Sequence, residues 1–428
     1  MINKKFYWLA PVLLGLFVFM ANRHFQALGI PNTWIVPINF LSFLYLIGLL
    51  GFAESNKTYR YRKTNRLNAV VIIPIFNEDP KTFRRSLESI EKQTLTPSFI
   101  HIIDDGSTSK ECQKEYRDWK KSSKLKSRYT YNKVNQGKRE VQAIGFRANK
   151  KAEIFITIDS DTVLDKNAIK NGLRPFGEPK VMSVAGLLVG LNSNKNLLTR
   201  LVDLGFVSSF LNGRAAWSRV NSVTVNCGGL AFYRSEVVNK YLEEYLAQTV
   251  MGKKASSGDD RMMTNLALLE GWTVFQSNSV GYTALPENIS HLVRQRVRWW
   301  RSFFWGGVWL LRRFSTDRLV WWLVVWQFVS FAFYTSVFIT LLSTSFKAGS
   351  VPWGFILYLM FTLSYVRSIR YLALELPGLK LKDRIITFAL APLSSLLHFF
   401  ICSVLQYYGL LTVGSTGWGT RKQVEVQT

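Results

Sequence analysis

Two carboxylates spaced two positions apart are the first feature of the chain that could do chemistry. Asp159 and Asp161 close a short apolar run, residues 154–158, whose β-branched and aromatic side chains without helical period predict a buried strand. At a strand end the backbone can turn both carboxylates toward one hard cation. Mg²⁺ is usually held by one or two carboxylates together with substrate phosphates. An isolated Asp-x-Asp also fits an exposed acidic turn, so the other motifs must decide.

Polar residues also end two other predicted strands. Residues 68–77 form a continuous apolar run that ends at Asn77 and Glu78, and the run at residues 99–103 leads to Asp105. Ligands of open α/β sheets bind at the carboxyl ends of the strands. Asp105 would accept hydrogen bonds from a nucleobase or ribose, although an Asx turn or a helix cap explains it equally well.

Two basic residues follow a glycine turn. Lys138 and Arg139 come directly after Gly137, where a helix is expected to begin. Backbone amides and cationic side chains at a helix start suit a diphosphate. The alternative is an ordinary solvated basic face.

A second acidic pair opens a later helix. Asp259 and Asp260 follow Gly258 and precede the helical pattern of residues 262–269. One carboxylate there fits a helix N-cap, but a second acid beside it suits a general base. Upstream, the glycines within residues 226–234 either let the backbone approach a ligand or form a bulge in a strand.

Arginines alternate with aromatic residues in the stretch from Gln295 through Arg298 and Trp299 to Trp305. Such a stretch can lie at a membrane interface. It can also bind phosphate and stack on sugar rings.

The elements that must position these residues alternate along the chain. Strands are expected at residues 68–77, 99–103, 128–132 and 154–158, with helical stretches between them. This alternation predicts a doubly wound α/β domain with a parallel sheet.

Uncharged apolar runs flank this polar middle. They cover residues 6–21, 33–53, 319–344, 351–366 and 385–411, the last with only His398 as an ionisable group. Several are long enough to span a bilayer. The first resembles a signal peptide in length, but no clean cleavage site follows it, so we expect a retained helix.

The net charge of +26 is unevenly distributed. Basic residues crowd positions 57–66, 312–318 and 367–384, whereas the short connections 22–32 and 345–350 carry only Arg23 and Lys347. This positive-inside pattern places the polar middle in the cytoplasm. It also explains the basic charge without nucleic-acid binding. The carboxylates at positions 105, 161 and 260 would repel the phosphates of a nucleic acid unless a metal intervened.

The number of membrane spans decides on which side of the membrane the chain ends. Four spans would return the chain to the cytoplasm near residue 367, so the last run either bends back near Pro392 or follows a hidden short span at 371–381.

The three cysteines, Cys112, Cys227 and Cys402, have neither metal spacing nor a disulfide pattern. A reduced cytosolic compartment suits them.

Together these motifs resemble the processive glycosyltransferases of family 2, whose catalytic domain has the GT-A fold. That family pattern is an aspartate at a strand end, an Asp-x-Asp, a (Thr/Gly)-(Glu/Asp)-Asp and a Gln-x-x-Arg-Trp. The matching residues here are Asp105, Asp159-Ser160-Asp161, Gly258-Asp259-Asp260 and Gln295-Arg296-Val297-Arg298-Trp299. The resemblance covers residues 6–422. It implies an α/β GT-A domain, Rossmann-like and cytosolic, inserted between transmembrane helices of a multi-pass plasma-membrane protein.

Within the family the chain most resembles bacterial class I hyaluronan synthases, through residues 135–139, 196–201, 257–261 and 418–422. It differs at residues 227–230, Cys-Gly-Gly-Leu, where those synthases usually have Cys-Ser-Gly-Pro-Leu. That segment lies near the acceptor in the family, and glucuronate–glucose capsule synthases share the terminal Trp-Gly-Thr-Arg. Chitin-, cellulose- and capsule-type synthases therefore stay open as alternatives, as does a lipid-linked monosaccharide transferase.

The resemblance implies specific roles. UDP-sugar donors would be bound by Asn77, Glu78, Asp105, Lys138, Arg139, Asp159, Trp418 and Arg421, with Mg²⁺ or Mn²⁺ on Asp161. Asp260 would be the general base, with Asp259, Gln295, Arg298 and Trp299 completing the catalytic set around a growing polysaccharide acceptor. The product would enter a channel between the membrane helices.

The implied domains follow from these assignments. Residues 1–56 hold two transmembrane helices, and residues 57–290 form the GT-A domain. Residues 291–316 form an interfacial segment with the Gln-x-x-Arg-Trp motif. Residues 317–413 form transmembrane or re-entrant helices, and residues 414–428 form a cytosolic tail.

Overall fold

A computed structural model describes residues 2–13, 15, 16, 19, 23, 48–56, 58–61, 63–332 and 353–415. Trp418 and Arg421, and the middles of several predicted spans, lie outside the described residues. Residues 63–332 are described without a gap.

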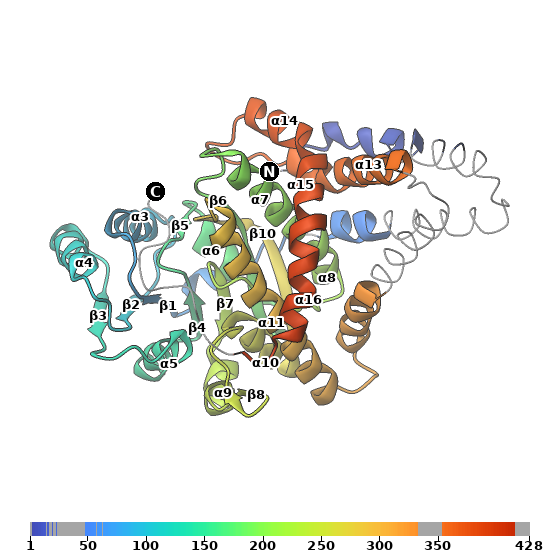
Figure 1. Cartoon of the computed structure of the whole chain (residues 1–428). Helices are drawn as coiled ribbons and strands as arrows, with labels where there is room; N and C mark the ends of the chain where they lie inside the picture. Colours follow the sequence, from blue (N-terminus) through green and yellow to red (C-terminus); the bar gives the residue numbers. More distant parts are fainter. Residues whose placement is uncertain are drawn as a thin grey trace.

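One mixed sheet forms the centre of the domain (Figure 1). Its strand order within the described residues is β3-β2-β1-β4-β7-β6-β10-β5. The strands are β1 (Ala69–Ile75), β2 (Phe99–Asp104), β3 (Ser127–Tyr131), β4 (Ile154–Thr157), β5 (Val163–Leu164), β6 (Val181–Gly190), β7 (Ala231–Arg234) and β10 (Trp272–Thr283). A separate hairpin joins β8 (Thr249–Val250) to β9 (Lys253–Lys254).

The first four strands are parallel, as the sequence predicts, and β1 pairs with both β2 and β4. The parallel arrangement predicted from residues 68–158 ends at β4, because β7 runs antiparallel to both β4 and β6. β7 has four residues and follows a glycine-rich turn. A segment this short carries no periodic signal for its direction.

Helices cover both faces of the parallel half. The alternating side chains of β1 show this, since Val71 and Ile73 pack into one core and Val70 and Ile72 into the other. The first core includes α3 (Pro80–Glu91) and α4 (Glu111–Ser122); the second includes α5 (Lys138–Ala148), α9 (Ser235–Leu246) and α10 (Asp259–Glu270). Burial on both faces explains why β1 reads as an unbroken apolar run.

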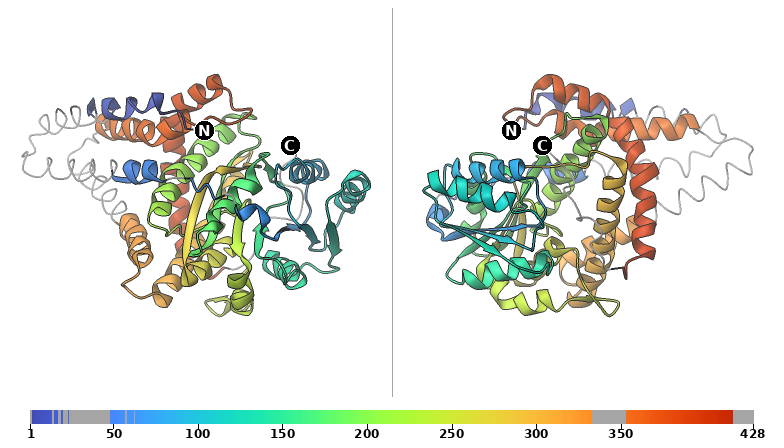
Figure 2. Two further views of the ribbon diagram at one scale, coloured as in Figure 1. Left: turned by 180° about the vertical axis from the view of Figure 1, so that it is seen from behind. Right: turned by 60° about the vertical axis from the view of Figure 1, so that its left-hand side comes forward.

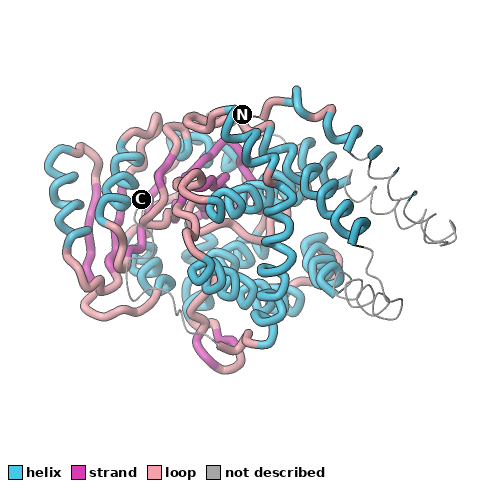
Figure 3. The backbone as a smooth tube through the Cα atoms, turned by 45° about the horizontal axis from the view of Figure 1, so that its top comes forward, coloured by secondary structure: helices cyan, strands magenta, loops and turns pink. Residues whose placement is uncertain are grey.

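The later helices lie on the side of the sheet away from α4 (Figure 2). They are α11 (Ile289–Arg313), the helix Leu319–Ala332, α13 (Trp353–Leu372), α14 (Leu381–Ala389), α15 (Ala391–Leu397) and α16 (Ser403–Leu411). Figure 3 shows this division between a strand-rich and a helical part. α7 (Leu197–Ser208) joins the two parts by packing on β6, α13 and α15.

One described helix, Ala391–Leu411, is long and apolar enough to cross a membrane, and Leu319–Ala332 is a shorter apolar helix. Large apolar side chains are exposed on both, among them Trp322, Val329, Phe400, Val404 and Leu411. A multi-pass topology stays a prediction.

The last apolar run does not form one straight helix. α14 ends at Ala389 and α15 begins at Ala391, with Pro392 in its first turn, where proline is well tolerated. The alternative of a hidden span at residues 371–381 is wrong, because the chain from Ala373 to Lys380 consists of a bridge, turns and loop.

Candidate active site

Lys138 lies at the centre of the acidic residues. Its Nζ is 2.7 Å from Asp159 Oδ1 and 3.0 Å from Asp259 Oδ2. Burial alone would lower the pKa of Lys138, but the two carboxylates outweigh it and raise the pKa well above its ordinary value. One ammonium group therefore joins the end of β4 to the start of α10. The two acidic motifs, 100 residues apart in the sequence, belong to one site.

Asp105 fixes the turn that opens α5. Its carboxylate accepts hydrogen bonds from the backbone N–H groups of Gln136 and Gly137, both at 2.8 Å. Gly137 has φ +92°, a conformation that favours glycine. Because Lys138 is the next residue, Asp105 helps to aim the ammonium group. Burial raises the pKa of Asp105.

Asn77 and Glu78 link the tips of neighbouring strands. Asn77 Oδ1 accepts a hydrogen bond from the Thr108 N–H at 2.9 Å, and Glu78 Oε2 accepts one from Ser160 Oγ at 2.7 Å. Glu78 thereby holds the residue between the two acids of the Asp-Ser-Asp motif. Both residues therefore shape the edge of the sheet where the parallel strands end.

Asp161 is half-buried just beyond β4, with Oδ1 3.4 Å from the hydroxyls of Thr162 and Thr283. The carboxylate and the two hydroxyl groups offer oxygen atoms as metal ligands, which suits Mg²⁺ or Mn²⁺. No group of three or more His, Cys, Asp or Glu side chains that could hold a metal occurs among the described residues. The carboxylate and hydroxyl oxygens at Asp161 fit a cation that takes the rest of its coordination from the phosphates of a substrate.

Asp259 and Asp260 form the first turn of α10. Gly258 precedes them with φ +72°, and a Cβ at this position would lie 2.7 Å from Ser302 Cβ and 2.9 Å from Trp305 Cζ2. The turn is therefore pressed directly onto α11. Glycine is required both for its conformation and for this close approach.

The two carboxylates differ in acidity. Burial and the charge of Asp259 raise the pKa of Asp260 to about 6. Burial alone would also raise the pKa of Asp259, but the charges of Lys138 and Arg139 outweigh it and lower the pKa. A base whose pKa lies near neutrality beside an ionised carboxylate is well matched to proton abstraction.

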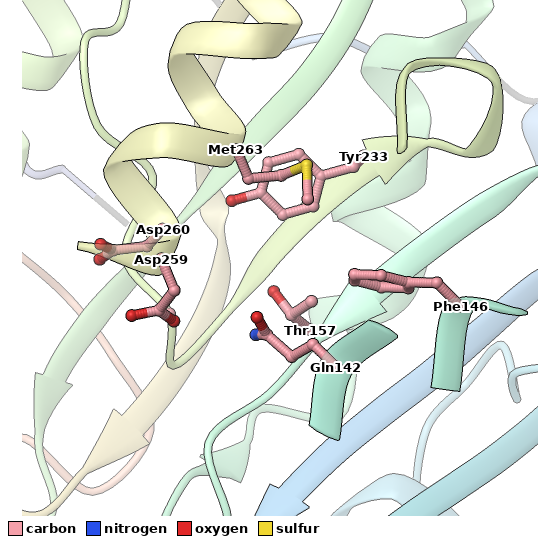
Figure 4. Close-up of a pocket in the computed structure, with 8 residues that line it drawn as sticks. Gln142, Phe146, Thr157, Tyr233, Asp259, Asp260 and Met263 are labelled. Carbon is pink, nitrogen blue, oxygen red and sulfur yellow. The ribbon is translucent and has the colours of Figure 1, made fainter. Parts of the chain in front are cut away.

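A small pocket adjoins this pair (Figure 4). In the close-up Asp259 and Asp260 project from the start of α10, and Gln142 and Thr157 lie across from Asp259. The lining residues are Gln142, Phe146, Thr157, Gly228, Tyr233, Asp259, Asp260 and Met263. Gly228 leaves room for the ammonium group, since a Cβ there would lie 2.9 Å from Lys138 Nζ.

Arg139, expected at a diphosphate, is buried with 4% of its surface exposed. Its guanidinium donates to the carbonyl oxygens of Tyr245 and Ser257 and to Gln248 Oε1. These contacts point away from a donor-binding role.

The Gln-x-x-Arg-Trp residues lie on α11, which packs on α10. Trp299 stacks on Phe206 with ring centroids 5.9 Å apart, and the Arg296 guanidinium lies 4.7 Å from the Trp299 ring centroid. Gln295 and Arg298 are half-buried on the same helix. Their roles at the acceptor stay predictions, as do those of Trp418 and Arg421, which lie outside the described residues.

Two arginines near Asp260 carried no role in the sequence interpretation. Arg261 directly follows Asp260, and Arg214 lies near Cys227, donating to the Val225 carbonyl oxygen at 3.1 Å. Burial lowers the pKa of Arg261 to about 10. Arg214 lies at the end of a π-helix (Ser209–Arg214) that the sequence did not predict.

Known proteins resemble this chain in sequence and in fold. The family model for glycosyl transferase family 2 matches residues 70–242. A hyaluronan synthase of Streptococcus pyogenes serotype M1 is 31% identical over 386 residues, which cover 89% of this chain and 90% of that protein. The chain belongs to glycosyltransferase family 2. It is a relative of the hyaluronan synthases, and the resemblance inferred from its motifs is confirmed.

Other relatives broaden the picture. An N-acetylglucosaminyltransferase of Azorhizobium caulinodans is 34% identical over 236 residues, which cover 55% of this chain and 59% of that protein. The solved mannosyltransferase of Pyrobaculum calidifontis, in complex with GDP-Man and Mn²⁺, aligns with a TM-score of 0.58 at 17% identity, covering 89% of this chain and 99% of that one. This second likeness supports the GT-A fold.

Proposed function

We propose that the chain is a membrane-embedded, processive, inverting glycosyltransferase that polymerises UDP-N-acetylglucosamine and UDP-glucuronate into hyaluronan. The observation that carries the proposal is the ammonium group of Lys138, which joins Asp159 to the Asp259–Asp260 turn. This arrangement occurs in a chain that is related to a hyaluronan synthase over nearly its whole length. The enzyme would lie in the plasma membrane with its catalytic domain in the cytosol.

In this mechanism Asp260 accepts the proton of an acceptor hydroxyl. The hydroxyl oxygen attacks the anomeric carbon of the donor as the bond from that carbon to the UDP oxygen breaks, so the configuration inverts. UDP leaves with the bonding electrons. Lys138 offsets the charge that develops on the diphosphate, a form of electrostatic stabilisation that often dominates such catalysis. Asp105 would bind the uridine portion.

A divalent cation fits the oxygen donors at Asp161 and, when bound, would supply positive charge to the diphosphate. Asp161 would hold it, with Asp159 shared between the site and Lys138. Asp105 and Glu78 would hold the turns at the ends of the strands in place, so that the bound UDP-sugar lies next to Asp260.

The acceptor would enter beside α11. Trp299 is held in orientation by Phe206 and Arg296, and a fixed indole offers a flat surface for a sugar ring. The exposed apolar side chains of the later helices would contact lipid, and the growing chain would pass between them.

Purified protein supplied with pairs of UDP-sugars and Mg²⁺ or Mn²⁺ tests the proposal. We expect high-mass polymer only when both UDP-N-acetylglucosamine and UDP-glucuronate are present, and we expect a hyaluronan-specific lyase to degrade it. Polymer made with UDP-glucose in place of UDP-N-acetylglucosamine would identify a capsule-type synthase. An organic-extractable product without polymer would identify a lipid-linked transferase.

A second candidate is a polymerase that uses UDP-N-acetylglucosamine alone. The N-acetylglucosaminyltransferase relatives favour it. Gly228 also lies against Lys138 where hyaluronan synthases usually have serine. Polymer from UDP-N-acetylglucosamine alone, resistant to the hyaluronan lyase, would establish this candidate.

A further inference from the structure

The connection between α9 and α10 determines where the catalytic acids lie. It runs through the β8–β9 hairpin, whose tip residue Met251 is 77% exposed, and ends at Gly258. Short, exposed hairpins contribute little stability of their own. The end of this connection that leads into Asp259 and Asp260 lies against α11 at Gly258, and a second contact ties it to α5.

The buried guanidinium of Arg139 makes that contact. Nη1 donates to the Tyr245 carbonyl oxygen at 3.1 Å and to Gln248 Oε1 at 2.9 Å, at the start of the connection. Nη2 donates to the Ser257 carbonyl oxygen at 2.9 Å, at its end. One side chain from α5 thus joins both ends of the same loop.

Packing holds the guanidinium in place. It lies 5.0 Å from the ring centroid of Tyr245 and 5.6 Å from that of Trp305, a residue of α11 that also contacts the turn at Gly258. The Tyr245 hydroxyl in turn donates to Gln142 Oε1 on α5 at 2.7 Å. α5, α9, α11 and the turn that leads into α10 therefore meet at this one cation.

The neighbouring residues of α5 act on the same region. Lys138 pairs with Asp159 and Asp259, and Glu140 pairs with Lys254 of the hairpin. The first turn of α5 therefore contacts the acids, the ends of the loop and its strand β9 through three consecutive side chains.

We propose that Arg139 is a positioning residue that clamps the loop of residues 246–258 and so sets the place of Asp260 relative to the donor, rather than a ligand of the diphosphate. This role rests on the proposed function, in which Asp260 is the base. Arginine suits it because a planar fork can bridge two separate acceptors, whereas a lysine ammonium acts as a single point charge.

Arg139→Lys tests the clamp while keeping the positive charge. We expect kcat for glycosyl transfer to fall about a hundredfold, as for a displaced catalytic group, while the KM for each UDP-sugar stays within about threefold. Arg147→Lys is the matched control, because Arg147 lies on the same helix but is exposed and pairs with Glu243, outside the loop of residues 246–258. We expect this control to match the wild type.

Hydrogen exchange measured by mass spectrometry gives a second readout that needs no activity. We expect amide exchange in residues 246–258 to accelerate about tenfold or more in Arg139→Lys and to be unchanged in Arg147→Lys. If Arg139→Lys does not give a monodisperse protein, Gln248→Leu removes one acceptor of the clamp and should lower kcat about tenfold with KM unchanged.

The outcomes are distinct. A large rise in donor KM or in the Kd of UDP, with kcat and loop exchange unchanged, would overturn the clamp and make Arg139 a diphosphate ligand. Unchanged kinetics and unchanged exchange would also overturn it. If the wild type transfers no sugar from any UDP donor, the proposed function fails, and the exchange experiment alone decides whether Arg139 fixes the loop.

Discussion

The acidity of Asp260 gives the sharpest test of the catalytic assignment. Burial and the neighbouring Asp259 raise its pKa to about 6. A general base must be ionised to act, so the rate should fall as the pH drops through this value. With a pKa of about 6, roughly nine-tenths of Asp260 is ionised at pH 7 and about a tenth at pH 5, so we expect kcat/KM at pH 5 to be about a tenth of its plateau.

Asp259→Asn should move this profile in a defined direction. The change removes a negative charge that disfavours ionisation of Asp260, and it leaves Lys138 with one fewer carboxylate to pair with. Both effects stabilise ionised Asp260 and lower its pKa, by about one unit for a like charge at this range. The variant should then keep about half of its own plateau at pH 5, against about a tenth for the wild type.

The assay is the initial rate of UDP release at limiting donor, from pH 4.5 to 8, because kcat/KM reports the groups of the free enzyme. Each profile is normalised to its own plateau, so a lower absolute rate in the variant does not affect the comparison. An acidic limb that stays in place or moves to higher pH in Asp259→Asn would refute the assignment of Asp260 as the base.

Three further changes separate the roles of single residues. Asp260→Asn should abolish transfer while leaving UDP affinity within about threefold, measured by calorimetry, since the change removes the base and keeps the shape. Near-normal turnover would place the base elsewhere. Trp299→Ala should shorten the polymer, measured by gel filtration, more than it slows donor hydrolysis, because it removes only a surface for the acceptor; equal losses would argue against that role. Gly258→Ala should destabilise the protein by about 2 to 4 kcal/mol, measured by denaturant unfolding of the purified protein, from the positive φ and the contact with Ser302 together. A change below about 0.5 kcal/mol would show that the turn is not fixed against α11.

Local sequence patterns predicted much of the domain. The apolar run at residues 68–77 contains β1 (Ala69–Ile75), and the run at 99–103 lies within β2 (Phe99–Asp104). The helical pattern at 262–269 lies within α10 (Asp259–Glu270). These elements are visible because strands buried on both faces and amphipathic helices have characteristic periods.

Features set by long-range packing could not be predicted in this way. Lys138 reaches Asp259, 121 positions away, and Arg139 reaches Ser257, 118 positions away, because α5 packs against α9. Nothing local distinguishes the lysine, which reaches the acids, from the arginine, which is buried among carbonyl oxygens. The antiparallel direction of β7 is likewise decided by its neighbours in the sheet.

The central claim is that the clustered acids and Lys138 form a site for a cation-bound nucleotide, and UDP binding with and without metal measures it most directly. By titration calorimetry we expect the wild type to bind UDP at least about tenfold more tightly with Mn²⁺ than with a chelator present, and we expect Asp161→Ala to lose this difference. Equal UDP affinity in both conditions, or an unchanged metal effect in Asp161→Ala, would contradict the account.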